Sequence, residues 1–301
     1  MSYRVVAIAV SFLLTLASAG CGRGDKPDAL WDVPGIRPLV YPRGIAYSRQ
    51  ADEFFTVDRI GRIQRISRGG NFINEWQMPE TSNGKPVGIS IGPDGNVYIP
   101  DTHYHRVIVY TPDGREIRRW GKLGTGPGEF IMPTDLAFDA FGRVFVSEYG
   151  DNDRIQVFDM QGKYLYAFGE FGNKPGQFSR PQSMVIDGNL LYATDACNHR
   201  ICVFTLDGKF VRVMGESGSG PGQFRFPYGL EQDGGGNLVV TEFGNNRVQI
   251  IDKVSGRCIW TFGQAGRAQG ELAYPWASVV DRRGRVVILD SGNNRIQIVG
   301  K

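Results

Sequence analysis

The stretch Glu242-Phe-Gly-Asn-Asn-Arg-Val-Gln-Ile250 returns almost letter for letter as Asp290-Ser-Gly-Asn-Asn-Arg-Ile-Gln-Ile298. Four earlier stretches repeat the same order of an acidic residue, a polar loop, an arginine and alternating apolar residues. The arginines of the six copies lie 44 to 48 residues apart, at Arg62, Arg106, Arg154, Arg200, Arg247 and Arg295. A repeat of this length is typical of propellers and solenoids, in which each unit buries its apolar face against the next.

Each repeat divides into four short apolar segments separated by turn residues. In the third repeat these segments are 134–138, 143–147, 154–158 and 163–168, and turns rich in Asp and Gly separate them. Alternating apolar positions bounded by Gly and Asp indicate β-strands, and no segment has helical periodicity. The sequence therefore predicts an all-β fold, a six-bladed β-propeller of four-stranded antiparallel blades.

The sixth repeat has only three such segments before Lys301, so its outer strand must come from elsewhere. Outer strands end in an aromatic residue or Met shortly before the next proline, and Trp31 stands in the same relation to Pro42. We therefore predict that residues 29–33 supply the outer strand of the last blade. The propeller domain would then run from 29 to 301.

The loops between repeats share a second motif, seen as Gly126-Pro-Gly-Glu-Phe130 and Gly220-Pro-Gly-Gln-Phe224. Its Phe or Leu is predicted to pack between adjacent blades. A proline follows each loop and should begin the inner strand, where its missing N–H is tolerated.

Residues 1–20 have the pattern of an export signal: Arg4 precedes an apolar run, and small residues follow. The segment ending at Cys21 resembles the lipobox of bacterial lipoproteins, in which that cysteine is acylated, although Ser18 stands where Leu is usual. We expect lipidation at Cys21, a tether over 21–28, and a location on the cell membrane or outer membrane, facing periplasm or exterior. The alternative is secretion after cleavage at Ala19.

Three further cysteines remain after this segment, namely Cys197, Cys202 and Cys258. The odd number argues against a disulfide framework, so we expect small buried side chains in strands. A bridge between Cys197 and Cys202 is an alternative that the sequence does not favour.

The repeated run of acid, Gly-Asn or Asn-His, and Arg-Ile-Gln-Val resembles the NHL-repeat family over nearly all of residues 42–299. The signal region further resembles exported bacterial lipoproteins. The family resemblance implies a six-bladed propeller used mostly as a platform for proteins, and sometimes for RNA or small ligands. A minority of relatives are enzymes, such as the lyases that amidate peptide hormones.

Since every blade carries the acid and the arginine, we interpret the pair as structural, with the guanidinium bound to the carboxylate. A ligand site should instead break the symmetry. The residues after the inner-strand prolines differ from blade to blade and should surround one channel mouth. We predict ligand binding there by Arg43, Thr134, Gln182, Tyr228 and Trp276; the alternative is a wet rim of ordinary polar residues.

A metal site is a weaker hypothesis. His103, His105, Cys197 and His199 all lie in the predicted loops and are residue types that bind zinc. The family's lyases take their metal histidines from the inner strands, where this chain has other residues. No nucleophile motif, phosphate-binding loop or carboxylate pair stands out from the repeat.

The leading hypothesis is therefore a lipid-anchored platform that binds a protein or glycan through its loop face and performs no chemistry. The alternative is a metal-dependent lyase or hydrolase with its site at the channel mouth. No cofactor is expected. Export and a formal charge of only +3 argue against a nucleic-acid partner.

Overall fold

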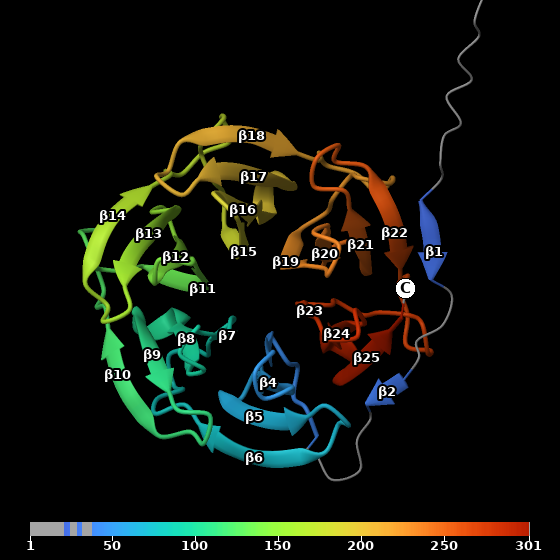
Figure 1. Ribbon diagram of the computed structural model, residues 1–301, viewed down its shortest axis with the longest axis horizontal. Coiled ribbons are helices and arrows are strands. Elements are labelled where there is room, and N and C mark those ends of the chain that lie inside the picture. The colour runs from blue at the N-terminus through green and yellow to red at the C-terminus, as the bar shows by residue number, and fades with distance from the viewer. Residues whose placement is uncertain (1–20, 25–28, 32–37, 301) are drawn as a thin grey trace, which may run out of the picture.

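The computed structural model describes residues 21–24, 29–31 and 38–300. Six sheets surround a central axis and follow one another in chain order (Figure 1). Within each sheet the innermost strand comes first along the chain and the strands then follow outward, apart from N-terminal segments that pair with the outer edges of the last two blades. The predicted six-bladed propeller of four-stranded antiparallel blades is confirmed.

The strand bounds follow the repeat. The innermost strands of blades one to six are β3 (Gly44–Ser48), β7 (Ser90–Ile91), β11 (Met132–Phe138), β15 (Pro181–Asp187), β19 (Pro227–Gln232) and β23 (Ser278–Val280). The second strands are β4 (Glu53–Val57), β8 (Val97–Asp101), β12 (Arg143–Tyr149), β16 (Leu190–Asp195), β20 (Leu238–Glu242) and β24 (Val286–Asp290). The third strands are β5 (Arg62–Ser67), β9 (Arg106–Tyr110), β13 (Arg154–Asp159), β17 (Arg200–Thr205), β21 (Arg247–Ile251) and β25 (Arg295–Val299). The outer strands are β6 (Phe72–Gln77), β10 (Glu116–Trp120), β14 (Tyr164–Phe168), β18 (Phe210–Met214), β22 (Cys258–Phe262) and β2 (Ala29–Trp31).

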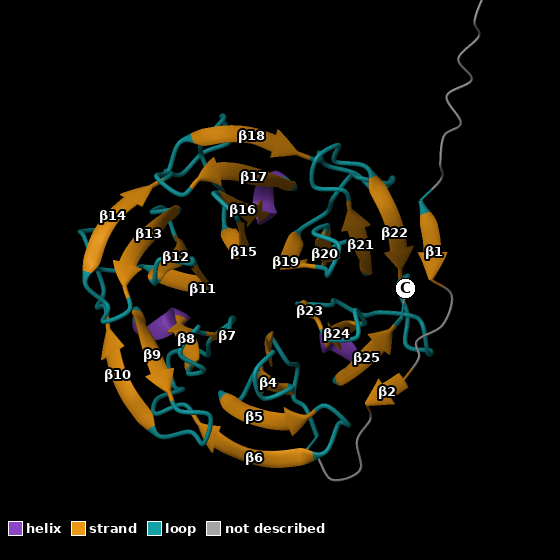
Figure 2. Ribbon diagram, viewed as in Figure 1, coloured by secondary structure: helices purple, strands orange, loops and turns teal. Residues whose placement is uncertain are grey.

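Helical structure in the described ranges is confined to three single turns between second and third strands (Figure 2). They are η1 (Thr102–Tyr104), η2 (Ala196–Asn198) and η3 (Ser291–Asn293). None of the helices in the part of the chain that the structure describes is long and apolar enough to cross a membrane.

The turn between the first two strands is fixed by an aspartate in blades two, three, five and six. In blade three, Asp139 Oδ1 accepts hydrogen bonds from the backbone N–H groups of Phe141, at 2.9 Å, and Arg143, at 2.8 Å. Gly142 has a φ of 76° in this turn, a conformation that glycine adopts without steric cost. The sequence therefore specifies this hairpin locally.

The repeated acid and arginine form an ion pair in every blade, with N–O distances of 2.6 to 2.9 Å. In blade three, Arg154 also donates to the carbonyl oxygens of Gly126 and Glu129 in the loop between blades. Gln156 donates to Glu129 O and to the Glu148 carboxylate, which is fully buried. The predicted structural role is confirmed, and the same group also ties neighbouring blades together.

The Phe or Leu of the loop between blades is fully buried at all four places where the motif occurs, namely Phe130, Phe178, Phe224 and Leu272. Phe130, for example, packs with Val107 of blade two and Val144 of blade three. The predicted packing between blades is confirmed.

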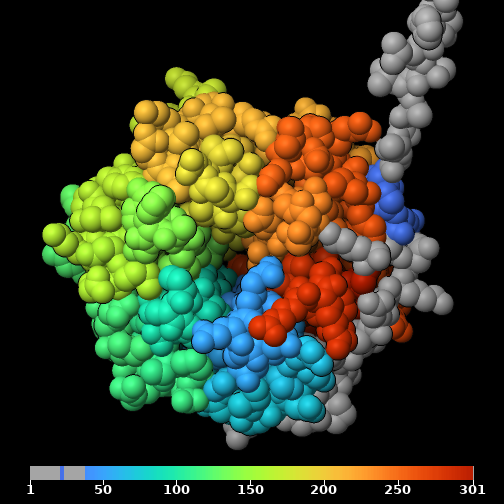
Figure 3. Space-filling model, viewed as in Figure 1, coloured from blue at the N-terminus to red at the C-terminus, as the bar shows by residue number. Residues whose placement is uncertain are grey.

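The ring is closed by the N-terminal strand β2, which pairs antiparallel with β25. Ala29 lies opposite Ile298, and Trp31 lies opposite Ile296. The space-filling view shows the blue first blade beside the red last blade (Figure 3). The predicted closure is therefore confirmed, since the last blade takes its outer strand from the opposite end of the chain.

A second N-terminal segment, β1 (Gly22–Gly24), pairs in parallel with β22 and adds a fifth strand to blade five. Beside it, Cys21 and Cys258 form a disulfide across 237 residues of sequence. The expectation that Cys258 is an unpaired core cysteine was wrong, because its half-buried place on an outer strand lets the N-terminal segment reach it. Cys197 and Cys202 are free, so the unfavoured bridge between them is not formed.

Candidate functional site

A channel with a cavity of about 660 Å³ runs along the propeller axis and is lined by the innermost strands of all six blades. Alternate residues of a strand point to the same side, so the second and fourth residues after each inner-strand proline face this space. Most of them are small. A Cβ on Gly88 would lie 2.2 Å from the carbonyl oxygen of Thr134, so glycine is required where neighbouring inner strands approach most closely.

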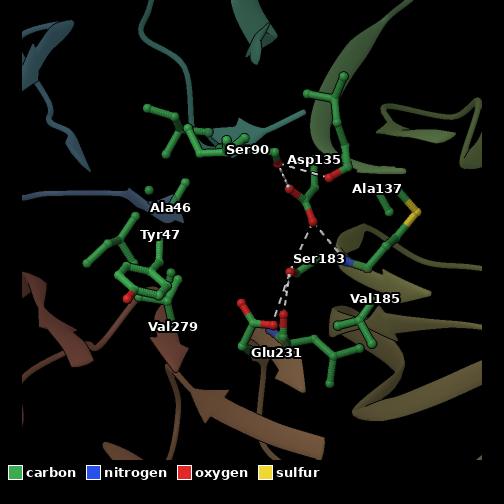
Figure 4. Close-up of a pocket in the computed structure, with 18 of the residues that line it drawn as sticks. Ala46, Tyr47, Ser90, Asp135, Ala137, Ser183, Val185, Glu231 and Val279 are labelled. Atoms are coloured by element: carbon green, nitrogen blue, oxygen red, sulfur yellow. Dashed lines mark hydrogen bonds between the residues drawn. The ribbon is translucent and has the colours of Figure 1, made fainter. Parts of the chain in front are cut away.

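Two of the channel positions carry carboxylates. Asp135 of β11 accepts hydrogen bonds from the Ser183 hydroxyl at 3.1 Å, the Ser90 hydroxyl at 3.3 Å and the Met184 N–H at 2.8 Å (Figure 4). Burial raises the pKa of Asp135 to about 6 despite these bonds, which favour the charged form.

Glu231 of β19 points into the same channel (Figure 4). Its carboxylate accepts a hydrogen bond from the Gln232 N–H at 2.9 Å and forms no ion pair with any described residue. Burial raises the pKa of Glu231 to about 7, although the hydrogen bond from Gln232 and the positive charge of Arg49 act in the opposite direction; the negative charge of Asp135 adds to the rise. Both carboxylates touch the cavity while lying deep in the molecule, so their protonation changes in the neutral range.

The expectation that no carboxylate pair departs from the repeat was wrong. Asp135 is the second residue after Pro133 and Glu231 is the fourth after Pro227, where the other blades carry Gly, Ala, Ser or Val. The two acidic residues therefore stand out in the sequence when the six inner strands are compared position by position. Only ring closure brings two such residues from different blades to one channel.

The aromatic residues predicted for the channel mouth do meet there. Tyr228 and Trp276 are each 8% exposed, and their ring centroids lie 5.0 Å apart in an edge-to-face arrangement. Phe243 stacks on Tyr228 at 4.8 Å, and two guanidinium groups complete the group: Arg43 lies over Trp276 at 5.3 Å and Arg180 over Tyr228 at 5.1 Å. We call these five residues the mouth cluster.

The two other predicted residues lie in the wall of the mouth. Thr134 is fully buried, and its hydroxyl is bonded to the Ser147 hydroxyl and the Pro181 carbonyl, both at 2.8 Å. Gln182 is 3% exposed and accepts a hydrogen bond from Arg180 Nε at 3.2 Å. These two side chains support the mouth cluster and present little surface to solvent.

Four residues directly before the inner-strand prolines adopt left-handed backbone conformations, with φ between 45° and 64°: Tyr41, Arg180, Phe226 and Tyr274. For bulky residues this conformation costs on the order of 1–2 kcal/mol each. An acceptor from the preceding blade fixes each backbone N–H, and these acceptors are Asn294, Asp153, His199 and Asn246. The strain is thus held by links between blades and turns these side chains towards the mouth.

The three histidines lie apart and contact different partners. His199 Nδ1 accepts the Phe226 N–H at 3.1 Å, the role that asparagine has in blades five and six. His105 Nδ1 contacts the carbonyl oxygen of Ile131, and His103 packs against Gly84. Cys197 is exposed. Within 21–24, 29–31 and 38–300, no three His, Cys, Asp or Glu side chains converge as a metal site.

Comparison with known proteins places these features in context. The NHL repeat family model matches residues 178–204. Human NHL repeat-containing protein 3 is 36% identical over 77 residues, covering 25% of this chain and 22% of that protein. Rat peptidylglycine alpha-amidating monooxygenase is 35% identical over 79 residues, covering 24% of this chain and 8% of that protein. The match therefore spans about a fifth or less of each curated relative's own length.

Among solved structures, a streptogramin B lyase is similar in fold, with a TM-score of 0.62. The superposition covers 90% of this chain and 96% of that chain, at 14% sequence identity. This similarity concerns the fold alone.

Proposed function

Because this chain carries the NHL repeat in a six-bladed propeller, we propose that it is an exported platform that binds a protein or glycan at its channel mouth. The observation that carries the proposal is the mouth cluster. The arginine of the repeat is paired with an acid in every blade, whereas the mouth gathers aromatic rings with two guanidinium groups that form no ion pair with any described residue.

Aromatic residues and arginine are the residue types that supply most of the affinity in protein interfaces. Here they are preorganised, because links between blades hold the neighbouring backbone and the rings pack against one another. Tyr274, which is 53% exposed and lies 5.1 Å from Phe243, extends the apolar surface outward from the mouth.

A site-specific crosslink tests this assignment. A photoreactive phenylalanine analogue at Tyr274 should form adducts with a ligand from the protein's own compartment. The matched control is Phe141, which is 79% exposed in the turn between β11 and β12, where the inner strand has already left the mouth. Equal adduct formation at both positions would show that the mouth is not the binding site.

We propose that residues 1–20 direct export and that Cys21 anchors the mature chain to a membrane through a lipid. Disulfides persist in oxidising compartments, so the Cys21–Cys258 bridge fits export as well. The two fates of Cys21 exclude each other on one molecule, because a thioether and a disulfide use the same sulfur.

Intact mass of the protein from the producing cell distinguishes them. A diacylglycerol adduct at Cys21, with Cys258 as a free thiol, supports the anchor, and the Cys21→Ser variant should then leave the membrane fraction. Unmodified Cys21 in a bridge to Cys258 rejects the anchor and retains export. An uncleaved N-terminus in the cytosol rejects both.

A lyase or hydrolase is a second candidate, favoured by one observation: the Glu231 carboxyl has a pKa of about 7 inside the channel. A group that titrates near neutrality is suited to act as a general acid or base. The metal-dependent form of this candidate predicts about one bound zinc or calcium per chain, although no three His, Cys, Asp or Glu side chains of the described residues converge to hold it. Metal-free protein in elemental mass spectrometry would reject that form.

A further inference from the structure

Three guanidinium groups gather at the channel mouth without a carboxylate partner. Arg43, Arg59 and Arg180 form no ion pair with any residue in the described part of the chain. Burial lowers the pKa of Arg43, and the positive charges of Arg59 and Arg180 lower it further, because each lies close enough to repel the Arg43 guanidinium. The carboxylate of Asp153 instead accepts hydrogen bonds from the backbone N–H groups of Arg180 and Gly150.

Three other arginines of the first blade are paired with carboxylates. Arg62 binds Asp58 at 2.7 Å, Arg65 binds Glu53 at 2.7 Å, and Arg68 binds Asp52 at 3.3 Å. The arginine of the repeat is likewise paired with an acid in every blade. Arg43 and Arg180, which lie where the channel opens and are partly or largely buried, have no such partner among the described residues.

Buried N–H donors at the same place also lack acceptors. The indole nitrogen Nε1 of Trp276 and the guanidinium nitrogen Nε of Arg43 are both buried without a hydrogen-bond partner. The Trp276 side chain is more than nine-tenths buried, and both residues line the channel cavity. A buried donor without a partner destabilises the free protein. A hydrogen-bond acceptor that enters the mouth therefore contributes more binding free energy than the same acceptor would at an open surface.

The aromatic rings themselves offer little free face. The guanidinium of Arg43 covers a face of Trp276, and Phe243 stacks on Tyr228 while Arg180 lies over the same ring. Recognition of a neutral sugar by stacking needs an open ring face, which these two rings do not present. The groups of the mouth cluster that remain available to a ligand are its N–H donors and its positive charges.

We propose that the mouth cluster binds a carboxylate of an acidic polypeptide, through the guanidinium groups of Arg43 and Arg180 and the indole N–H of Trp276. The planar guanidinium fork matches a carboxylate and forms shorter, stronger hydrogen bonds with it than a neutral donor does. Tyr274 contacts the apolar neighbours of that carboxylate. This inference rests on the proposed platform function and names its ligand class as an acidic peptide.

The test measures fluorescence anisotropy with the full chain and a short fluorescein-labelled peptide rich in glutamate, with an amidated C-terminus. Comparison probes are the same peptide with every glutamate replaced by glutamine, that glutamine peptide with a free C-terminal carboxylate, and a labelled oligogalacturonate. The variants are Arg43→Met, Arg180→Met and Trp276→Phe. Arg68→Met is the control, because it removes the same charge from an arginine that is already paired.

We expect the glutamate peptide to bind about tenfold more tightly than the amidated glutamine peptide, since a charge-assisted hydrogen bond is worth about that factor. Arg43→Met and Arg180→Met should each weaken binding about tenfold, and Arg68→Met less than about twofold. Trp276→Phe keeps a ring and removes only the N–H donor, so it should weaken binding severalfold. Tight binding of the glutamine peptide with a free C-terminus supports the proposal too, with the terminal carboxylate as the ligand group.

Three outcomes would overturn the inference. Equal affinity for the glutamate and glutamine peptides would show that the carboxylate is not recognised. A loss of affinity in Arg68→Met equal to that in the mouth variants would show that the mouth is not the binding site. Tighter binding of oligogalacturonate would identify the ligand as an acidic glycan instead of a peptide. If both peptides bind equally but Tyr274→Ala weakens both, the platform stands and only the acid preference fails. If no probe binds and the crosslinker at Tyr274 finds no ligand, both proposals fail. Melting curves of Arg180→Met, whose side chain is half-buried, show that a loss is not unfolding.

Discussion

Replacing Glu231 by glutamine should stabilise this protein at alkaline pH. The pKa of the Glu231 carboxyl rises from its ordinary value of 4.5 to about 7 on folding, because burial opposes its charge and no cation pairs with it. The folded state therefore holds a proton on Glu231 that the unfolded chain loses between these two values. Stability from this group is fully present below pH 4.5 and is lost as the pH rises through 7.

The magnitude follows from the shift. A pKa difference of about 2.5 units corresponds to about 3 kcal/mol, and most of that free energy is lost between pH 5 and pH 8. The Glu231→Gln variant has no such charge and keeps an oxygen that can accept the Gln232 N–H. We expect its gain in unfolding free energy at pH 8 to exceed its gain at pH 5 by about 2–3 kcal/mol, or roughly 5 °C in Tm.

Urea unfolding monitored by tryptophan fluorescence at pH 5 and pH 8 measures the difference. Glu170→Gln provides the matched control, because Glu170 is exposed and should change the unfolding free energy by less than about 0.5 kcal/mol at either pH. An equal gain at both pH values, or a loss at pH 8, would show that the ionised carboxylate is compensated in the channel. The result also bears on function, since a residue that lowers stability is one that selection for stability alone would replace.

Further predictions concern the scaffold. Glu242→Ala leaves a largely buried arginine without its partner and should cost about 3–5 kcal/mol in chemical denaturation, whereas Arg119→Ala, in a half-exposed pair, should cost at most about 1 kcal/mol. His199→Asn should melt close to the parent protein, because asparagine has the same linking role in two other blades, while His199→Ala should lower the unfolding free energy by about 1 kcal/mol. Indistinguishable melting of the two His199 variants would count against the link between blades. Deleting residues 29–31 should open the ring and broaden the unfolding transition in calorimetry; an unchanged cooperative transition would contradict closure.

Part of the candidate site could be predicted from the sequence. Arg43, Tyr228 and Trp276 were found by asking which residues differ between repeats after the same proline, and the structure places them together at the mouth. Thr134 and Gln182 satisfied the same criterion, yet their polar groups are already bonded in the wall. The position of a residue in the repeat determines where its backbone lies. Whether its side chain is already hydrogen-bonded depends on the residues of the adjacent blade.

Local signals in the amino-acid sequence specify the blade, the number of blades and the closure of the ring. Those features depend on local signals repeated six times: alternating apolar residues, Asp and Gly turns, an acid paired with an arginine a few positions later, and a blade that lacked its outer strand. Which residues meet across the axis depends on the folded ring. Asp135 and Glu231 are 96 positions apart and acquire raised pKa values only because the ring buries both in one channel. Cys21 and Cys258 form their bridge for a similar reason, since the N-terminal segment is laid along the outer strand of blade five. Burial and approach between distant segments are properties of the closed ring, and no stretch of the repeat encodes them.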